Sequence, residues 1–305
     1  MCIFVGDMSN TIQIRGKLID LSTPQVMGIL NVTPDSFYAG SRVQTEDEIV
    51  KRCHQIIDEG ASMIDVGGYS TRPGGTEVSE SEEMERLRFG LGIIRRELPD
   101  AVISVDTFRT DVARMTVEEF GADIINDVSE GCEAMYRLVS RLHVPYILMS
   151  QQPTLKQMLM NFAQQVQQLR DFGACDIILD PGFGFGKTLE QNYEIMNEME
   201  RLHVMELPLL VGISRKSMIF KLLGITPTES LNGTTVLNTI SLMKGAHILR
   251  VHDVKQAVEC VRMVQSLNGK IVKSSNKNVL RIRYQGFYRH TACSTDTLLY
   301  LQAYA

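Results

Sequence analysis

The sequence predicts a (β/α)₈ barrel, and three observations support this. Short apolar runs recur along the chain, polar residues with a Gly or Pro follow each run, and stretches with apolar residues at helical spacing separate the runs. Runs that are apolar throughout are typical of parallel strands buried on both faces, and parallel strands need a crossover of a dozen or more residues, usually a helix. Eight such units imply a barrel of roughly 250 residues. A doubly wound open sheet is the alternative.

Each predicted strand is short and stops at a polar residue or a glycine. Helical spacing predicts helices over 46–59, 82–98 and 155–172. In a barrel of this kind, the carboxyl ends of the strands and the loops after them form the active face. The strands, each with the residue that follows it, are 26–30 with Asn31, 63–66 with Gly67, 102–105 with Asp106, 124–125 with Asn126, 146–149 with Ser150, 177–179 with Asp180, 209–211 with Gly212 and 248–251 with His252.

The two ends of the chain fall outside this repeat. Residues 1–24 contain the alternating segment 12–16, which predicts a β-hairpin that closes the barrel floor. After residue 268 the repeat stops, and residues 269–305 carry six Lys or Arg against the single acid Asp296. We therefore expect one barrel domain over residues 1–268 and a basic C-terminal tail of unknown structure.

Composition predicts a cytoplasmic globular protein. The 305 residues are 44% hydrophobic and 22% charged, with a net charge of -5. The sequence has no run of about twenty apolar residues to span a bilayer and no signal-peptide pattern at its start. Its acidic balance argues against nucleic acid as a partner. The six cysteines form no C-x-x-C pair, which argues against zinc and disulfides, and we expect most of them to be buried fillers.

Polar residues of mixed charge are predicted to gather at the active face. A single Asp or Asn at a strand end equally serves to cap the next helix. Five basic residues in one mouth, however, repel one another unless an anion or a carboxylate lies between them, and arginine and lysine suit phosphate oxygens. A phosphorylated substrate follows from that grouping. The basic residues are Arg72, Arg215, Lys216, Arg250 and His252.

Two loops stand out. The turn 180–187 places an acid and a lysine around closely spaced glycines, but its spacing matches neither a phosphate-binding P-loop nor a dinucleotide fingerprint. The loop 31–37 is long and bears Phe37, which either forms part of a lid or packs under its own loop.

Seven blocks, in order from residue 28 to residue 253, resemble the dihydropteroate synthases, transferases of folate and tetrahydrofolate biosynthesis. The blocks are 28–37 (GILNVTPDSF), 65–74 (DVGGYSTRPG), 104–107 (SVDT), 125–128 (INDV), 180–187 (DPGFGFGK), 212–217 (GISRKS) and 250–253 (RVHD).

The resemblance implies the condensation of 6-hydroxymethyl-7,8-dihydropterin diphosphate with 4-aminobenzoate, which releases diphosphate and gives 7,8-dihydropteroate. It also implies Mg²⁺ as cofactor, loss of diphosphate through a pterin cation before attack by the amine, inhibition by sulfonamides and a homodimer. The alternatives are a pterin-binding methyltransferase domain and a non-catalytic pterin binder.

The resemblance also assigns residues to each part of the site. Catalysis falls to Asp106, Asp180 and Lys216. The pterin would be bound by Asp106, Asn126, Met149, Asp180, Gly184 and Lys216, the diphosphate by Asn31, Arg72, Arg250 and His252 with Mg²⁺ on Asn31, and aminobenzoate by Phe37, Thr71, Pro73, Phe185, Lys216 and Ser217.

The chain departs from the family at a few positions. Ala39 stands where many relatives have an Asp in the first loop, although Asp35 remains there with an expected metal or loop-ordering role. Ser150, in a neutral polar run, replaces a common histidine, and Glu130 stands where other residues are usual.

Overall fold

The computed structural model describes residues 10–32, 42–69, 78–267 and 269 of the chain. Within them, eight parallel strands form one sheet in the order β8-β7-β6-β5-β4-β3-β10-β9, and a bridge between Leu179 and Leu209 brings its two edges together. The predicted barrel is confirmed, with a strand over each predicted apolar run. The strands are β3 (Gln25–Asn31), β4 (Met63–Gly67), β5 (Val102–Asp106), β6 (Ile124–Asp127), β7 (Tyr146–Met149), β8 (Ile177–Asp180), β9 (Leu210–Val211) and β10 (Ile248–Val251).

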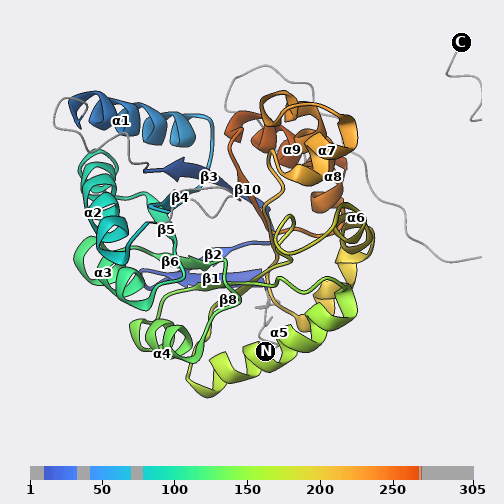
Figure 1. Cartoon of the computed structure of the whole chain (residues 1–305), viewed down its shortest axis with the longest axis horizontal. Helices are drawn as coiled ribbons and strands as arrows, with labels where there is room; N and C mark the ends of the chain where they lie inside the picture. Colours follow the sequence, from blue (N-terminus) through green and yellow to red (C-terminus); the bar gives the residue numbers. More distant parts are fainter. Residues whose placement is uncertain (1–9, 33–41, 70–77, 268, 270–305) are drawn as a thin grey trace, which may run out of the picture.

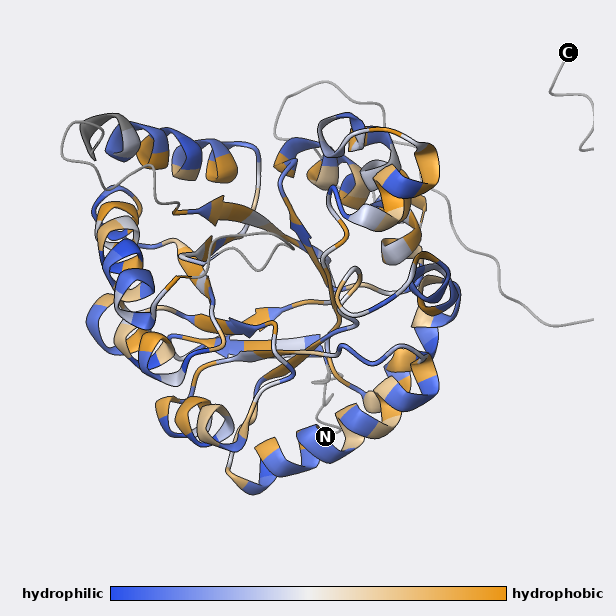
Figure 2. Cartoon of the chain, in the orientation of Figure 1, coloured by the Kyte–Doolittle hydropathy of each residue, from blue (hydrophilic) through white to orange (hydrophobic). Residues whose placement is uncertain are grey.

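The helices surround the strands on the outside (Figure 1). Figure 2 shows hydrophobic residues along the strands and hydrophilic ones on the outer faces of the helices. The helices are α1 (Arg42–Asp58), α2 (Glu80–Glu97), α3 (Thr110–Phe120), α4 (Glu133–Leu142), α5 (Leu155–Asp171), α6 (Leu189–Glu198), η3 (Met199–Met205), α7 (Ser217–Leu223), η4 (Pro227–Glu229), α8 (Leu231–Met243) and α9 (Val254–Leu267).

Local signals explain where several helices begin. The side chain of Thr188 accepts from the backbone N–H of Gln191, and Gln191 returns a bond to the backbone of Thr188, so α6 starts with a capping box. Ser79 and Thr154 cap α2 and α5 through single bonds of the same kind. Each cap satisfies a backbone donor that the helix leaves free and stabilises the helix by about 1 kcal/mol.

The predicted hairpin is present and closes the barrel floor. Strands β1 (Thr11–Ile14) and β2 (Lys17–Asp20) pair antiparallel and cross the barrel in Figure 1. Its residues Ile12, Ile14 and Leu21 form one buried cluster with the residues that begin the barrel strands. Those residues are Met27, Met63, Ile124, Ile147, Ile178, Leu210 and Ile248.

The structure corrects the expectation about the cysteines and leaves the expectation about the C-terminal tail as a prediction. The four described cysteines are free. Cys53 and Cys260 are buried fillers, as predicted, whereas Cys132 and Cys175 are exposed. The division at residue 268 stays a prediction, because residues 270–305 lie outside the described part of the chain. Within that part, no helix combines the length and hydropathy needed to cross a membrane.

Candidate active site at the barrel mouth

A buried ion-pair network lies inside the barrel at its carboxyl end. The guanidinium of Arg250 donates through Nε to Asp65 Oδ2 and through Nη2 to Asp106 Oδ2, both at 2.6 Å. Asn126 Nδ2 donates to the same oxygen of Asp65 at 3.2 Å. These residues come from β10, β4, β5 and β6, so the closure of the barrel brings together side chains up to 185 positions apart.

Three polar atoms in this network or beside it have no hydrogen-bond partner within the described residues. They are Asp65 Oδ1, Asn126 Oδ1 and the hydroxyl oxygen of Ser104, and all three are buried. An unsatisfied buried polar atom costs about 1–3 kcal/mol, so such atoms are uncommon in native proteins. Their grouping at the barrel mouth indicates a site whose partners arrive with a ligand.

Asp106 titrates well above an ordinary carboxyl group. The pKa of Asp106 is raised to about 7, chiefly by burial, with the charges of Asp65, Asp127 and Glu83 contributing and the charge of Arg250 opposing the shift. Perturbed carboxyl groups of this kind gather at functional sites. Asp106 is therefore partly protonated near neutral pH until a positive charge approaches.

A second acid and a lysine face each other on the other side of the mouth. Asp180 ends β8 and accepts from the backbone N–H of Gly182 at 2.8 Å. Burial raises the pKa of Asp180 and lowers that of Lys216 to about 8, and each residue's charge opposes the shift of the other. Lys216 precedes α7, donates to the carbonyl of Phe183, and places its Nζ 4.4 Å from the centre of the Phe185 ring.

The glycine-rich turn is shaped to approach its neighbours closely. Gly184 has φ of +81°, and a Cβ there would lie 3.1 Å from Cδ of Lys216. Gly182 has φ of +65°, and a Cβ there would meet the Ser150 carbonyl at 2.2 Å. Met149, fully buried at the end of β7, is also next to Gly182. Glycine is needed at both positions for the backbone conformation and for the space.

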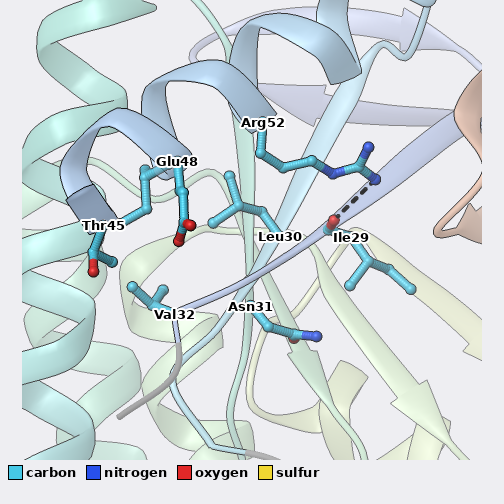
Figure 3. A pocket seen from close by; sticks show the side chains of 8 residues that line it. Ile29, Leu30, Asn31, Val32, Thr45, Glu48 and Arg52 are labelled. Carbon is cyan, nitrogen blue, oxygen red and sulfur yellow. Dashed lines mark hydrogen bonds between the residues drawn. The ribbon is translucent and has the colours of Figure 1, made fainter. Parts of the chain in front are cut away.

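Asn31 and His252 lie at neighbouring strand ends. Asn31 ends β3, and its Oδ1 faces Gly67 at the end of β4. His252 follows β10, and its Nδ1 lies 3.1 Å from the hydroxyl of Ser214. Arg52 of α1 connects the two strands, since its Nη2 donates to the carbonyl oxygens of His252 (2.7 Å) and Ile29 (3.4 Å). A pocket between β3 and α1 opens here, and Figure 3 shows Asn31 pointing away from Arg52.

The described site residues lie at the carboxyl ends of the barrel strands, in the loops after them or at the start of α7, but acids neutralise the basic cluster. Arg215 forms a two-bond ion pair with Asp253 (2.9 and 2.5 Å), and Arg250 is held by Asp65 and Asp106. Carboxylates thus already separate these cations, so the cluster by itself no longer points to a phosphorylated substrate. Four predicted site residues lie outside the described part of the chain, together with Asp35 and Ala39. The four are Phe37, Thr71, Arg72 and Pro73.

Sequence reasoning gave no role in the site to three charged residues. Asp65 lies in the middle of β4 and is fully buried. Its signal was an acid inside an otherwise apolar strand, which is stable only with a buried partner. Glu130 and Lys187, in the loops after β6 and β8, join the loops around the mouth, and no spacing in the sequence indicates their contacts.

The described residues offer few ligands for the expected Mg²⁺. Among the described residues, no group of three or more His, Cys, Asp or Glu side chains is arranged to hold a metal ion. Mg²⁺ usually keeps several waters and binds through one or two protein oxygens together with substrate phosphates. The amide oxygen of Asn31, exposed at the end of β3, fits an ion held mainly by a diphosphate.

Comparison with known proteins identifies the family. The family model described as "Pterin binding enzyme" matches residues 27–252. The dihydropteroate synthase of Escherichia coli K12 is 41% identical over 268 residues, which cover 83% of this chain and 94% of the relative.

Solved structures agree with the sequence match. A Yersinia pestis dihydropteroate synthase in a sulfonamide complex superposes with a TM-score of 0.76 at 38% identity, and a Xanthomonas albilineans enzyme with 4-aminobenzoic acid superposes with 0.77 at 32%. In both cases 85% of this chain and 98% of the other are covered. The predicted resemblance is confirmed, and so is the prediction of a transferase. The chain belongs to the dihydropteroate synthase family of pterin-binding enzymes.

Proposed function

We propose that this protein condenses 6-hydroxymethyl-7,8-dihydropterin diphosphate with 4-aminobenzoate to give 7,8-dihydropteroate and diphosphate, a step of folate biosynthesis. The observation that carries the proposal is the set of acceptors at the barrel mouth, formed by the buried Asn126 and Asp180 and the largely buried Asp106. A pterin ring presents amide and amino N–H donors along one flat edge, and buried carboxylate and amide oxygens match such an edge. Met149 supplies an apolar wall beside it.

Loss of diphosphate comes first in the proposed reaction. The bond between the pterin methylene carbon and the diphosphate oxygen breaks, and its electron pair leaves with the diphosphate. Because the carbon adjoins an electron-rich ring, the remaining pterin cation is stabilised between Asp106 and Asp180. Negative charge that is already fixed where positive charge develops is usually the largest catalytic contribution.

The amine of aminobenzoate then attacks that carbon. A C–N bond forms, and the nitrogen loses a proton to the departing diphosphate or to water, so no covalent enzyme intermediate is needed. Lys216, whose pKa is about 8, is mainly an ammonium at pH 7 and donates to the acceptor atoms of the pterin ring. Phe185 and Ser217, with Phe37, Thr71 and Pro73, form the aminobenzoate slot.

The diphosphate is bound by Asn31, Arg72, Arg250 and His252 in this proposal. Asp65 and Asp106 orient the Arg250 guanidinium before substrate arrives, and Ser214 lies within hydrogen-bond distance of the His252 ring. Mg²⁺ held by Asn31 and the diphosphate would neutralise negative charge on the leaving oxygens.

The proposal is tested by incubating the purified protein with dihydropterin diphosphate, Mg²⁺ and radiolabelled 4-aminobenzoate. We expect labelled dihydropteroate from wild type and little from Lys216→Ala. The exposed Lys156 of α5 provides the matched control, because Lys156→Ala should keep full activity. Bound pterin without product would favour a methyltransferase domain or a non-catalytic pterin binder.

Sulfonamides should compete with aminobenzoate. Since they resemble aminobenzoate in shape and a relative has been solved with one, we propose that the same slot binds them. A sulfonamide should raise the apparent KM for aminobenzoate and leave the maximal rate unchanged. Normal turnover at saturating sulfonamide would remove this part of the proposal.

A homodimer through the last helices is also proposed. Among the described residues, six of nine large exposed apolar side chains lie on α7, α8 and α9, which are neighbours in Figure 1. Exposed apolar groups gathered on one side favour a protein interface. Light scattering should give twice the chain mass, and Met243→Glu with Met263→Glu should give the monomer. We expect the enzyme to act in the cytoplasm.

A further inference from the structure

Lys187 lies behind the substrate-facing residues, in a ring of backbone oxygens. Its ammonium donates to the carbonyls of Ser150 (2.8 Å), Gly182 (3.0 Å) and Phe185 (3.2 Å). Among the described residues, no carboxylate lies within ion-pair distance of it. Burial lowers the pKa of Lys187 to about 8, while the charges of Asp180 and Glu130 oppose the shift. A partly buried cation held by carbonyls alone is costly, which indicates that its contacts matter.

The turn that Lys187 holds has little regular structure of its own. Gly182, Gly184 and Gly186 all have positive φ, between +60° and +81°. The turn is kept in shape by short contacts such as Phe185 N–H to Gly182 O (3.1 Å) and Gly184 N–H to Asn192 Oδ1 (2.7 Å). The Lys187 ammonium draws two carbonyls of this turn toward one point and joins them to the loop after β7.

Glu130 holds the loop on the other side of that ammonium. Its Oε1 accepts from the backbone N–H of Gln151 (2.7 Å), from Gln152 Nε2 (3.1 Å) and from Asn161 Nδ2 (3.3 Å). Glu130 has φ of +70°, a conformation that costs a side-chain-bearing residue about 1 kcal/mol. A strained residue persists where its surroundings over-determine it, and here the three hydrogen bonds to the Glu130 carboxylate do so.

The contacts of Lys187 extend to residues of the proposed aminobenzoate slot. Phe183, whose carbonyl accepts from Lys216, and Phe185, whose ring lies beside the Lys216 ammonium, are both in the turn that Lys187 fixes. On the basis of the proposed function, we infer that Lys187 is a positioning residue. It holds the Phe185 wall of the aminobenzoate slot against Lys216, and Glu130 supports it through the loop after β7. Neither residue needs to touch substrate for this role.

The test compares the two Michaelis constants in four variants. Lys187→Met and Glu130→Ala should each raise KM for aminobenzoate about tenfold and leave KM for the pterin diphosphate within about twofold. Glu130→Gln keeps an acceptor oxygen and should stay near wild type. Lys156→Met removes an exposed lysine of α5 and serves as the matched control.

Hydrogen exchange separates this inference from the proposed function. Peptides covering 181–188 should exchange faster in Lys187→Met and Glu130→Ala than in wild type or Lys156→Met. If the wild-type protein makes no dihydropteroate, the proposed function is wrong. If hydrogen exchange of residues 181–188 is also unchanged in the variants, the positioning role of Lys187 is wrong as well. In an active enzyme, equal rises of both KM values, or unchanged KM for aminobenzoate despite faster exchange, would overturn it.

Discussion

The two ends of the barrel are built from the same strands and have opposite chemistry. At the floor the strands present apolar side chains that the hairpin seals, whereas two residues further along four of these strands present charged or amide side chains. Residues two apart on a strand face the same side and are about 7 Å apart. The pairs are Met63 and Asp65, Ile124 and Asn126, Ile178 and Asp180, and Ile248 and Arg250.

The difference lies in how completely each end is satisfied. The floor cluster is closed, with every residue at most 4% exposed. Among the described residues, the buried oxygens of Asp65, Ser104 and Asn126 at the mouth include atoms without hydrogen-bond partners, and the pKa of Asp106 is raised to about 7, chiefly by burial. The floor therefore contributes stability, and the mouth holds unfavourable charge and polarity that a ligand can relieve. Substitutions at the two ends should separate these contributions.

Removing a charge at the mouth should have the largest effect on activity. Asp106→Asn keeps the shape of the side chain but removes the negative charge proposed to stabilise the pterin cation. We expect kcat to fall about 10²-fold to 10³-fold. The free energy of unfolding should stay the same or rise, because a buried carboxylate is lost while Arg250 keeps Asp65. Steady-state kinetics would measure kcat, and denaturant unfolding would measure the free energy of unfolding. A large loss of stability would contradict the view that the mouth serves activity and the floor serves stability.

Truncation at the floor should show the reverse. Ile178 is fully buried below Asp180 on the same strand. Ile178→Ala should lower the free energy of unfolding by about 2–5 kcal/mol, and Ile178→Val by about 0.5–1.5 kcal/mol. With the folded fraction taken into account, kcat should remain within about twofold of wild type. A specific loss of kcat in Ile178→Val would show that the floor also shapes the site.

Substitutions at two glycines with the same backbone conformation distinguish the effect of backbone strain from the effect of steric crowding by a new Cβ atom. Gly182 and Gly224 both have φ of +65°, but a Cβ at Gly224 meets nothing within 4 Å, whereas one at Gly182 lies 2.2 Å from the Ser150 carbonyl. Gly224→Ala should lower stability by about 1–2 kcal/mol and leave activity intact. Gly182→Ala should lower stability more and also impair turnover. Equal effects of the two substitutions on stability and rate would show that the close contact is unimportant.

The smallest predicted effect is the pH dependence of the free enzyme. The pKa of Asp106 is raised to about 7 and that of Lys216 is lowered to about 8. Because the carboxylate and the ammonium are the active forms, kcat/KM should rise as pH increases through about 7 and fall above about 8. Residual activity of Asp106→Asn should lack the rise near pH 7. A rise that persists in this variant would assign it to another group.

The fold was predictable because its signals are local. Each strand is a short apolar run, and helix starts such as Thr188 with Gln191 are marked within four residues. The strand ends also placed Asp106, Asn126 and Asp180 correctly at the mouth. The resemblance to the family added the chemistry that the residues alone left open.

The partners of the site residues were not predictable, because they depend on how distant strands meet. Asp65 and Arg250 are 185 positions apart, and the pairing of Arg215 with Asp253 joins two different loops. The sequence indicated an excess of positive charge at the mouth because it did not show which acids face it. The contacts of Glu130 were hidden for the same reason, although its unusual residue type was visible.

The most direct test of the account is a crystal structure of the protein with dihydropterin diphosphate bound. We predict that the N–H donors of the pterin lie within hydrogen-bond distance of Asp106, Asn126 and Asp180, and that oxygens without partners among the described residues, such as Asn126 Oδ1, gain partners. A pterin bound elsewhere, or one in the mouth that leaves these oxygens without partners, would contradict the assignment of this end of the barrel as the catalytic site.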